Sequence, residues 1–327
     1  MLNLLYKVLF GKEVILYNPH RNSVPLANAI NKKRYVFVNY NPIWKLTRLM
    51  GRGNKIRYKA MSLLLTVIKP RYIIDINWIS KLQFLFLVWC RNHRPSEFIV
   101  VQHGLYKGGI ITDNAHKYAK CDVILCWGEQ SEREFLKYNK GKNIRIIKFG
   151  NTFYNNYNRE LFKFPESAGD RVLIAPTVLW NERKVALENL TRKLSSLGFS
   201  VFLKEHQAQS KLSTPIDYPV KVSGNFYEML RNHEYDIVIC DTSTSLVDSL
   251  FLKNPTLYFS PPGDFIEFTK NVYTGYLKNL HDHIDEMDDK ANLYKFVDLT
   301  NQENLFNFIH TKGNNSLLDL PYRLQST

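Results

Sequence analysis

Short apolar runs alternate with longer segments of helical pattern along most of the chain. In the first half, the apolar runs predict β-strands at Glu13–Tyr17, Tyr35–Val38, Tyr72–Asp75, Glu97–Gln102, Asp122–Cys126 and Ile144–Phe149. The segments between them predict helices at Val24–Asn31, Ile43–Ile68, Ile79–Arg91 and Gln130–Tyr138. Strands that alternate with helices in this way are typical of βαβ units, which build a parallel sheet.

A polar segment interrupts this alternation in the middle of the chain. Residues Asn151–Asp170 are rich in Asn, Pro, Ser and Gly, which indicates a linker between two domains. Beyond it the pattern restarts, with predicted strands at Arg171–Ala175, Val201–Lys204, Asp236–Cys240, Thr256–Phe259 and Tyr294–Leu299. Helices are predicted at Glu182–Leu197, Tyr227–Asn232, Ser245–Leu252 and Glu303–His310. We therefore predict an α/β protein with two doubly wound, Rossmann-like domains that face each other across a cleft, at residues 1–155 and 156–327. The C-terminal helix is expected to pack back on the N-terminal domain.

The composition is that of a globular protein, with 45% hydrophobic residues among 327. The longest apolar stretches, Met61–Ile68 and Leu82–Cys90, are far shorter than the roughly 18–20 residues that span a membrane. The N-terminus is too soon interrupted by charge, at Lys7, to be a secretory signal. We therefore expect a soluble, cytoplasmic protein. The cysteines have no metal-ligand spacing and are expected to be buried, reduced thiols: Cys90, Cys121, Cys126 and Cys240.

A formal net charge of +14 points to an anionic partner, such as a phosphorylated substrate, a membrane lipid or a nucleic acid. Much of the excess lies in one predicted helical region, where basic residues alternate with apolar ones. Such a surface is typical of peripheral attachment to an anionic membrane, here the inner face of the plasma membrane. A solvated helix face is an equally good interpretation. The basic residues are Lys45, Arg48, Arg52, Lys55, Arg57, Lys59 and Lys69.

The first motif with candidate chemistry follows the predicted strand that ends at Gln102. His103 stands at the carboxyl end of this strand, where open α/β sheets bind their ligands, and Gly104 lets the backbone approach a ligand. Histidines titrate near neutral pH, so His103 can accept the proton of an attacking acceptor hydroxyl. The alternative is a histidine that only holds its own loop through hydrogen bonds.

Two further motifs follow predicted strands of the second half. Lys204 and His206 could hold a phosphate leaving group, although an ordinary surface Lys-Glu-His segment is an alternative. The strand that ends at Cys240 leads into a run of hydroxyl residues and then a helix. Hydroxyls and free backbone N–H groups at a helix N-terminus form a phosphate site, and simple helix capping needs only one hydroxyl. The run consists of Thr242, Ser243, Thr244 and Ser245, and Ser245 with Asp248 has the spacing of a capping box.

The order of these motifs resembles that of a group of inverting GT-B glycosyltransferases. The group comprises the CDP-glycerol glycerophosphotransferases and the bacterial sialyltransferase-like and Kdo-transferase-like enzymes of capsule and lipopolysaccharide synthesis. The resemblance rests on the three motifs and on two further segments, and it runs from about Glu97 to Pro262. These segments are His103-Gly104, Cys121–Glu129, Phe149–Asn151, Lys204–His206 and Thr242–Ser245.

The resemblance implies transfer of a sugar or polyol phosphate from a CMP- or CDP-linked donor to a glycan or lipid-linked glycan. It makes His103 the general base and assigns donor phosphate to Lys204, His206 and the hydroxyl run, with Asp248 directed toward the donor ribose. The N-terminal domain would then bind the acceptor and the C-terminal domain the donor. Gln207 stands where the family has Pro, which leaves the identity of the donor open.

Other features receive less weight. His20 and Arg21 follow the first predicted strand and could line the acceptor side of the cleft, or form a polar turn. His281-Asp282-His283 lies in an acidic helical stretch without further ligands, so it is interpreted as solvated surface. With no Asp-x-Asp motif either, we expect neither a metal nor another cofactor.

Two other functional classes stay under consideration. A UDP-sugar 2-epimerase would share the two-domain shape, but it would need several carboxylates in its cleft. A non-catalytic nucleic-acid-binding protein is suggested only by the charge, because no recognisable binding module is present and the basic residues gather near the N-terminus. We therefore expect no nucleic-acid partner.

Overall fold

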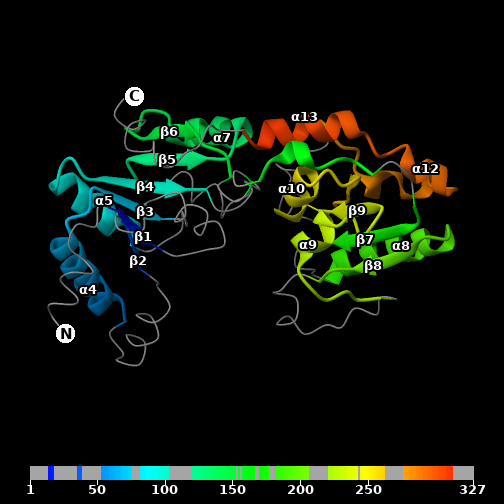
Figure 1. Cartoon of the computed structure of the whole chain (residues 1–327), viewed down its shortest axis with the longest axis horizontal. Coiled ribbons are helices and arrows are strands. Elements are labelled where there is room, and N and C mark those ends of the chain that lie inside the picture. Colours follow the sequence, from blue (N-terminus) through cyan, green and yellow to red (C-terminus); the bar gives the residue numbers. More distant parts are fainter. Residues whose placement is uncertain are drawn as a thin grey trace. The chain divides into compact units, whose positions relative to one another are not determined.

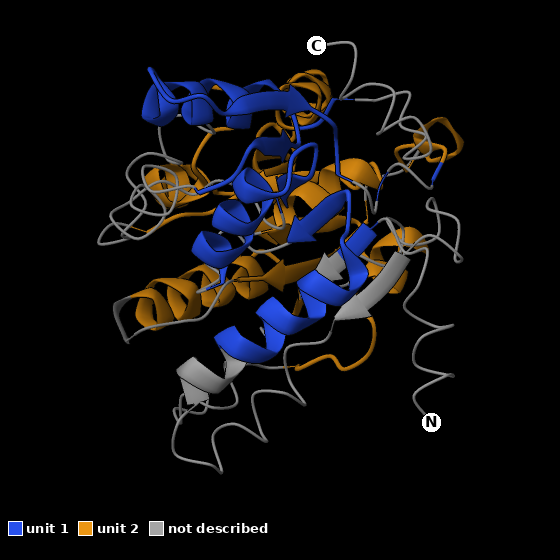
Figure 2. Ribbon diagram, turned by 90° about the vertical axis from the view of Figure 1, so that its left-hand side faces the viewer, with its two compact units in different colours: residues 1–104, 113–157, 310–327 blue, residues 105–112, 158–309 orange. Residues whose placement is uncertain are grey.

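The chain folds into two compact units in a computed structural model (Figures 1 and 2). Unit 1 comprises residues Met1–Gly104, Asp113–Tyr157 and His310–Thr327, and unit 2 comprises Leu105–Thr112 and Asn158–Ile309. The structure describes residues 14–17, 35–38, 53–75, 82–102, 120–151, 154, 157–165, 169–176, 181–205, 220–241, 244–261 and 275–311.

Unit 1 is built on a six-stranded, wholly parallel sheet with the order β2-β1-β3-β4-β5-β6. Strands β3, β4 and β5 are almost entirely buried, as expected for parallel strands that are covered on both faces. The strands are β1 (Val14–Tyr17), β2 (Tyr35–Val38), β3 (Tyr72–Asp75), β4 (Glu97–Val101), β5 (Val123–Cys126) and β6 (Arg145–Lys148).

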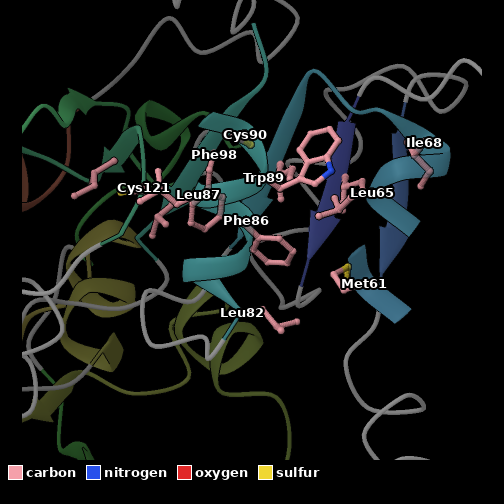
Figure 3. Close-up of a cluster of buried hydrophobic side chains, with 14 of the residues drawn as sticks. Met61, Leu65, Ile68, Leu82, Phe86, Leu87, Trp89, Cys90, Phe98 and Cys121 are labelled. Atoms are coloured by element: carbon pink, nitrogen blue, oxygen red, sulfur yellow. The ribbon is translucent and has the colours of Figure 1, made fainter. Parts of the chain in front are cut away.

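Helices α4 (Gly53–Ile68), α5 (Gln83–Asn92) and α7 (Glu129–Asn139) connect these strands. Helices α4 and α5 each present an apolar stripe to the core, whereas the buried side of α7 combines Phe135 with the polar residues Gln130, Ser131 and Asn139. In α4 the stripe is Met61, Leu65 and Ile68, which lies in one buried cluster with Phe86 and Cys90 of α5 (Figure 3). Helices α4 and α5 also contact each other directly. They therefore form adjacent parts of one helical layer.

Unit 2 contains a four-stranded parallel sheet with the order β10-β9-β7-β8. Its strands are β7 (Arg171–Ala175), β8 (Ser200–Leu203), β9 (Ile237–Cys240) and β10 (Thr256–Tyr258). The helical elements are η2 (Arg159–Leu161), α8 (Asn181–Ser196), α9 (Phe226–Arg231), α10 (Thr244–Phe251), η4 (Leu280–Glu286), α12 (Lys290–Tyr294) and α13 (Leu299–Ile309). Buried aliphatic residues of β7, β9 and α8 form the centre of its core.

The outer edge of β10 is occupied by two side-chain amides. The Gln302 amide, from α13, accepts a hydrogen bond from the Thr256 N–H (3.2 Å) and donates one to the Thr256 carbonyl (2.9 Å). Asn279 does the same at Ser260, accepting from its N–H (2.8 Å) and donating to its carbonyl (2.9 Å). Each amide thus replaces the main-chain partner that a further strand would provide.

Over the described residues the predicted strands and helices are confirmed except for one wrong strand, and the short elements η2, η4 and α12 were not predicted. The segment predicted as the strand Tyr294–Leu299 instead contains the end of α12, a turn and the start of α13. Its backbone closes tight turns, because Phe296 and Val297 donate to the carbonyls of Leu293 and Tyr294. The apolar residues that suggested a strand pack half-buried against the unit 2 core. The predicted helix Val24–Asn31 and the first part of Ile43–Ile68 lie outside the described residues.

The expected state of the cysteines is confirmed: all four are buried, free thiols. Burial raises the pKa of the Cys126 thiol to about 12 and raises those of the other three as well. No helix within the described part of the chain is long and apolar enough to cross a membrane.

Candidate functional site

The carboxyl edge of the unit 2 sheet is the candidate site. Its parallel strands all end at this edge, where doubly wound sheets bind their ligands. The residues that follow β7, β8 and β9 are Pro176, Lys204 and Asp241. Lys204 is half-buried, and its N–H donates to the Ile174 carbonyl of β7 (2.9 Å), which continues the ladder one residue beyond β8. The charged residues Lys204 and Asp241 therefore stand at this edge, and the backbone of Lys204 is held in place by the sheet.

A buried ion pair between Arg183 and Asp241 lies at this edge. Arg183 is in the first turn of α8, and its Nη2 lies 3.3 Å from Oδ2 of Asp241. The two side chains are only 8% and 5% exposed. A guanidinium near a helix N-terminus is disfavoured by the helix dipole, so Asp241 provides the charge that makes this position tolerable.

The pair forms the polar wall of a small hollow. The rest of its lining comes from β7, β9, α8 and the segment after β10, and it is almost wholly apolar. An apolar hollow with one desolvated ion pair is a setting in which electrostatic interactions are stronger than in water. The lining residues are Ile174, Pro176, Arg183, Leu187, Ile239, Cys240, Asp241, Phe259 and Pro261.

Helix α10 begins beside the pair, at Thr244. The Ser245 hydroxyl donates to the Ala175 carbonyl at the end of β7 (3.2 Å), so it fastens the start of α10 to the neighbouring strand. Ser245 also hydrogen-bonds the Cys240 thiol; burial raises the pKa of that thiol, and this bond partly offsets the rise. The predicted capping box is wrong in its placement, because Ser245 lies inside the helix and not at its N-cap.

Asp248 is buried in the same helix, with 3% of its surface exposed. The structure therefore describes four of the predicted donor-site residues, Lys204, Thr244, Ser245 and Asp248, and places all of them on β8's end or in α10. Strand β7 lies between β8 and β9. The other predicted site residues lie outside the described residues: His20, Arg21, His103, Gly104, His206, Thr242 and Ser243.

Arg183 and Asp241 were not among the predicted site residues. A signal for Asp241 was present, since it follows the strand directly and precedes the hydroxyl run. A signal for Arg183 was present as well, because a basic residue in a helix's first turn opposes the helix dipole and needs a compensating partner. The two residues are 58 positions apart in the sequence, so a local sequence pattern cannot predict that they pair.

The His281-Asp282-His283 segment lies in η4, as part of a half-exposed surface. His283 Nδ1 lies 3.0 Å from Glu286 Oε1, and His281 Nδ1 lies 3.5 Å from Asp282 Oδ1. Across the residues described, no group of three or more His, Cys, Asp or Glu side chains could hold a metal ion.

No protein-family model matches the sequence, and no curated protein matches it. Solved structures do match over nearly the whole chain. S. aureus MnaA in complex with UDP is 12% identical, with a TM-score of 0.57, and the match covers 97% of this chain and 98% of that one. The wall teichoic acid polymerase TagF is 12% identical, with a TM-score of 0.56 and coverages of 98% and 92%. The spinosyn rhamnosyltransferase SpnG is 13% identical, with a TM-score of 0.55 and coverages of 96% and 100%.

These similarities, together with the two parallel sheets, define the fold. The chain has the α/β GT-B fold, which consists of two Rossmann-like units. At this level of identity the comparison concerns the fold, and function has to be argued from the site.

Proposed function

We propose that this protein is a glycosyltransferase that uses a nucleotide-activated donor. The proposal rests on the carboxyl edge of the unit 2 sheet. There the Ser245 hydroxyl at the start of α10 donates a hydrogen bond to the end of β7, close to the buried Arg183–Asp241 pair. A fixed helix N-terminus with hydroxyl residues suits the phosphate groups of a nucleotide donor. Two proteins of the same fold, the rhamnosyltransferase SpnG and the teichoic acid polymerase TagF, support this proposal.

The proposed donor is linked to CMP or CDP, and the proposed acceptor is a glycan or lipid-linked glycan of lipopolysaccharide or capsule. These finer assignments rest on the sequence motifs. With a sugar donor, an acceptor hydroxyl attacks the anomeric carbon as its proton passes to His103, the bond from that carbon to the donor phosphate oxygen breaks, and the nucleotide leaves with both electrons of that bond. Lys204 and His206 offset the charge of the departing phosphate. A single displacement inverts the configuration, and no metal takes part.

The proposal is tested with a thermal-shift screen of CMP, CDP, UDP and GDP. Ligand binding to the folded state raises its apparent stability by mass action, so one of these nucleotides should raise the melting temperature. Replacing Ser243, Thr244 and Ser245 by Ala should weaken binding, since each lost hydrogen bond to a charged group is worth roughly 1.5–3 kcal/mol. Ser195→Ala, an exposed hydroxyl in α8, is the matched control.

A folded triple variant with unchanged nucleotide affinity would contradict the assignment of the hydroxyl run. The fold is shared with UDP-N-acetylglucosamine 2-epimerase from Rickettsia bellii, which has a TM-score of 0.55. A separate assay therefore follows the C2 configuration of UDP-N-acetylglucosamine without any acceptor. Interconversion under those conditions would replace the transferase proposal by the epimerase alternative.

A further inference from the structure

Large apolar side chains are exposed on the outer face of the α4–α5 layer in unit 1. Leu63 and Val67 of α4 are 67% and 45% exposed, and Phe84 and Val88 of α5 are 57% and 38% exposed. Within each helix the two residues are four positions apart, so they share one side of that helix. Both helices bury their opposite sides in the same core cluster (Figure 3). Each pair therefore lies on the exposed side of its own helix, and the two helices contact each other.

The charges around these residues have one sign. Neither α4 nor α5 contains an Asp or a Glu. Lys59 and Arg91 are exposed on the same two helices, and Lys69 is exposed directly after α4. Lys120 Nζ lies 4.9 Å from the centroid of the Phe84 ring, which places a cation beside the exposed aromatic. The outer face thus combines apolar side chains with cations.

Acidic residues near the ends of these elements are engaged with other cations. Glu97 pairs with Arg145, and Asp122 accepts a hydrogen bond from the Phe98 N–H and lies 3.6 Å from Arg94. They therefore do little to offset the positive field of the α4–α5 face, in a chain whose formal net charge is +14. A face with this composition complements a surface that is negative and also accepts apolar groups.

We propose that the outer face of α4 and α5 is a membrane-docking surface for a bilayer that contains anionic lipid. Leu63, Val67, Phe84 and Val88 enter the boundary between headgroups and acyl chains, while the surrounding Lys and Arg side chains stay at the phosphates. This inference does not depend on the proposed transfer reaction, because it uses none of the donor-site residues.

The first experiment is co-sedimentation of the full-length protein with vesicles of phosphatidylcholine alone or with a quarter phosphatidylglycerol. Binding is expected only to the anionic vesicles and should weaken as salt rises, since exposed charges are screened over about 8 Å at physiological ionic strength. The double variant Leu63→Ser/Phe84→Ser should bind at least roughly tenfold more weakly, because the lost apolar groups no longer leave water. Each of Lys59→Gln and Arg91→Gln should weaken binding by roughly fivefold. Val185→Ser, at an equally exposed apolar position in unit 2, should bind as the unaltered protein does.

The second experiment reports the position of the face directly. The native cysteines are buried with raised pKa values, so a thiol-reactive environment-sensitive dye should label only an introduced cysteine. A dye on Val88→Cys should shift its emission to the blue when anionic vesicles are added. The same dye on Val185→Cys should show no shift.

Three outcomes would overturn the proposal. The first is the absence of binding to anionic vesicles at low salt. The second is binding that leaves the dye at Val88→Cys unchanged and is insensitive to Leu63→Ser/Phe84→Ser, which would place the contact elsewhere. The third is a dye shift that follows protein concentration without vesicles, together with a dimer that the double variant dissociates. That result would make the face a contact between two copies of the chain.

Discussion

Arg159 and Glu303 are 144 residues apart in the sequence, and their side chains form a two-pronged ion pair in unit 2. Nη1 and Nη2 of Arg159 lie 2.6 and 2.9 Å from the two carboxylate oxygens of Glu303. The same guanidinium lies 4.1 Å from the centre of the Phe306 ring and donates to the Leu250 carbonyl (2.9 Å). Arg159 stands where the chain has just entered unit 2, and Glu303 stands shortly before it leaves. The Arg159 side chain therefore links the segment near the start of unit 2 to α13 and α10.

Arg159→Ala should destabilise unit 2 by roughly 2–4 kcal/mol, because it removes hydrogen bonds to a charged group and a cation–π contact. The measurement is the free energy of unfolding in urea, followed by a signal from unit 2. Arg133→Ala, which removes an exposed pair with Glu129 within α7, is the control and should cost less than about 0.5 kcal/mol. Equal effects of the two substitutions would show that the Arg159 pair contributes no more than a surface pair.

His103 and His206, two of the predicted site histidines, should differ in their effects on catalysis. His103→Ala should lower the chemical rate by roughly 10²–10⁴-fold with donor affinity nearly kept, which is the usual contribution of a general base. His206→Ala should weaken donor binding as well as the rate, because the donor phosphate is present before the reaction. Single-turnover rates and donor dissociation constants measure both quantities, and His283→Ala in η4 is the matched control. Near-normal turnover of His103→Ala would move the base to another residue.

The Arg183–Asp241 pair should have separable effects on stability and binding. Arg183→Gln should destabilise the fold by about 3–5 kcal/mol, because it leaves a buried carboxylate without its guanidinium. The double variant Arg183→Met/Asp241→Leu should recover most of this loss, since apolar residues of similar volume replace buried ion pairs well. Urea unfolding gives the stability of each variant.

The same double variant tests whether the pair takes part in donor binding. If the donor phosphate uses the guanidinium, the refolded double variant should bind the nucleotide at least roughly tenfold more weakly, the loss expected for one charge-assisted hydrogen bond. A double variant that is stable and binds with unchanged affinity would restrict the pair to a structural role.

The buried thiols should make the protein less stable in alkali. A thiol in the unfolded chain ionises near pH 9, whereas burial keeps the pKa of each folded thiol well above this value, about 12 for Cys126. Below pH 9 both states hold the proton, so these groups contribute no pH dependence. Above pH 9 the unfolded state loses protons that the folded state retains, and stability should fall by up to about 1.4 kcal/mol per pH unit for each thiol.

Unfolding free energies between pH 8 and 10.5 measure this slope. Cys121→Ala removes one fully buried thiol and should make the slope shallower, whatever it does to stability at neutral pH. An unchanged slope would assign the alkaline loss to other groups, such as Tyr235 and Tyr294, whose pKa values are also raised by burial.

Most of the fold could be predicted from the sequence because its central strands, such as β3, β5 and β9, are buried on both faces. Such strands appear as short, unbroken apolar runs, and β3, β5 and β9 lie within one residue of their predicted bounds. The same reasoning failed at Tyr294–Leu299. There Tyr294, Phe296 and Val297 are apolar because they cover the core from a turn, and local composition does not distinguish this from a strand.

The candidate site could be predicted only in part, because part of it depends on the order of the strands in the sheet. Lys204 directly follows β8 and α10 begins a few residues after β9, so the rule that ligands bind at carboxyl strand ends predicted them as site residues. Arg183 reaches the same edge from a helix, and its partner Asp241 follows a strand that is not consecutive with β7 in sequence. That pairing depends on the strand order, which the hydrophobic pattern does not contain.

The amides of Gln302 and Asn279 have a consequence for the behaviour of the protein at high concentration. An open edge strand is a template on which a second molecule can extend the sheet, and this is a common first step of aggregation. Here the outward main-chain groups of Thr256 and Ser260 are already bonded within the molecule. Gln302 belongs to α13, near the point where the chain leaves unit 2. A partly folded chain in which α13 has detached therefore exposes an open edge strand again. This species, more than the native protein, is the one that aggregates and on which chaperones and refolding buffers act.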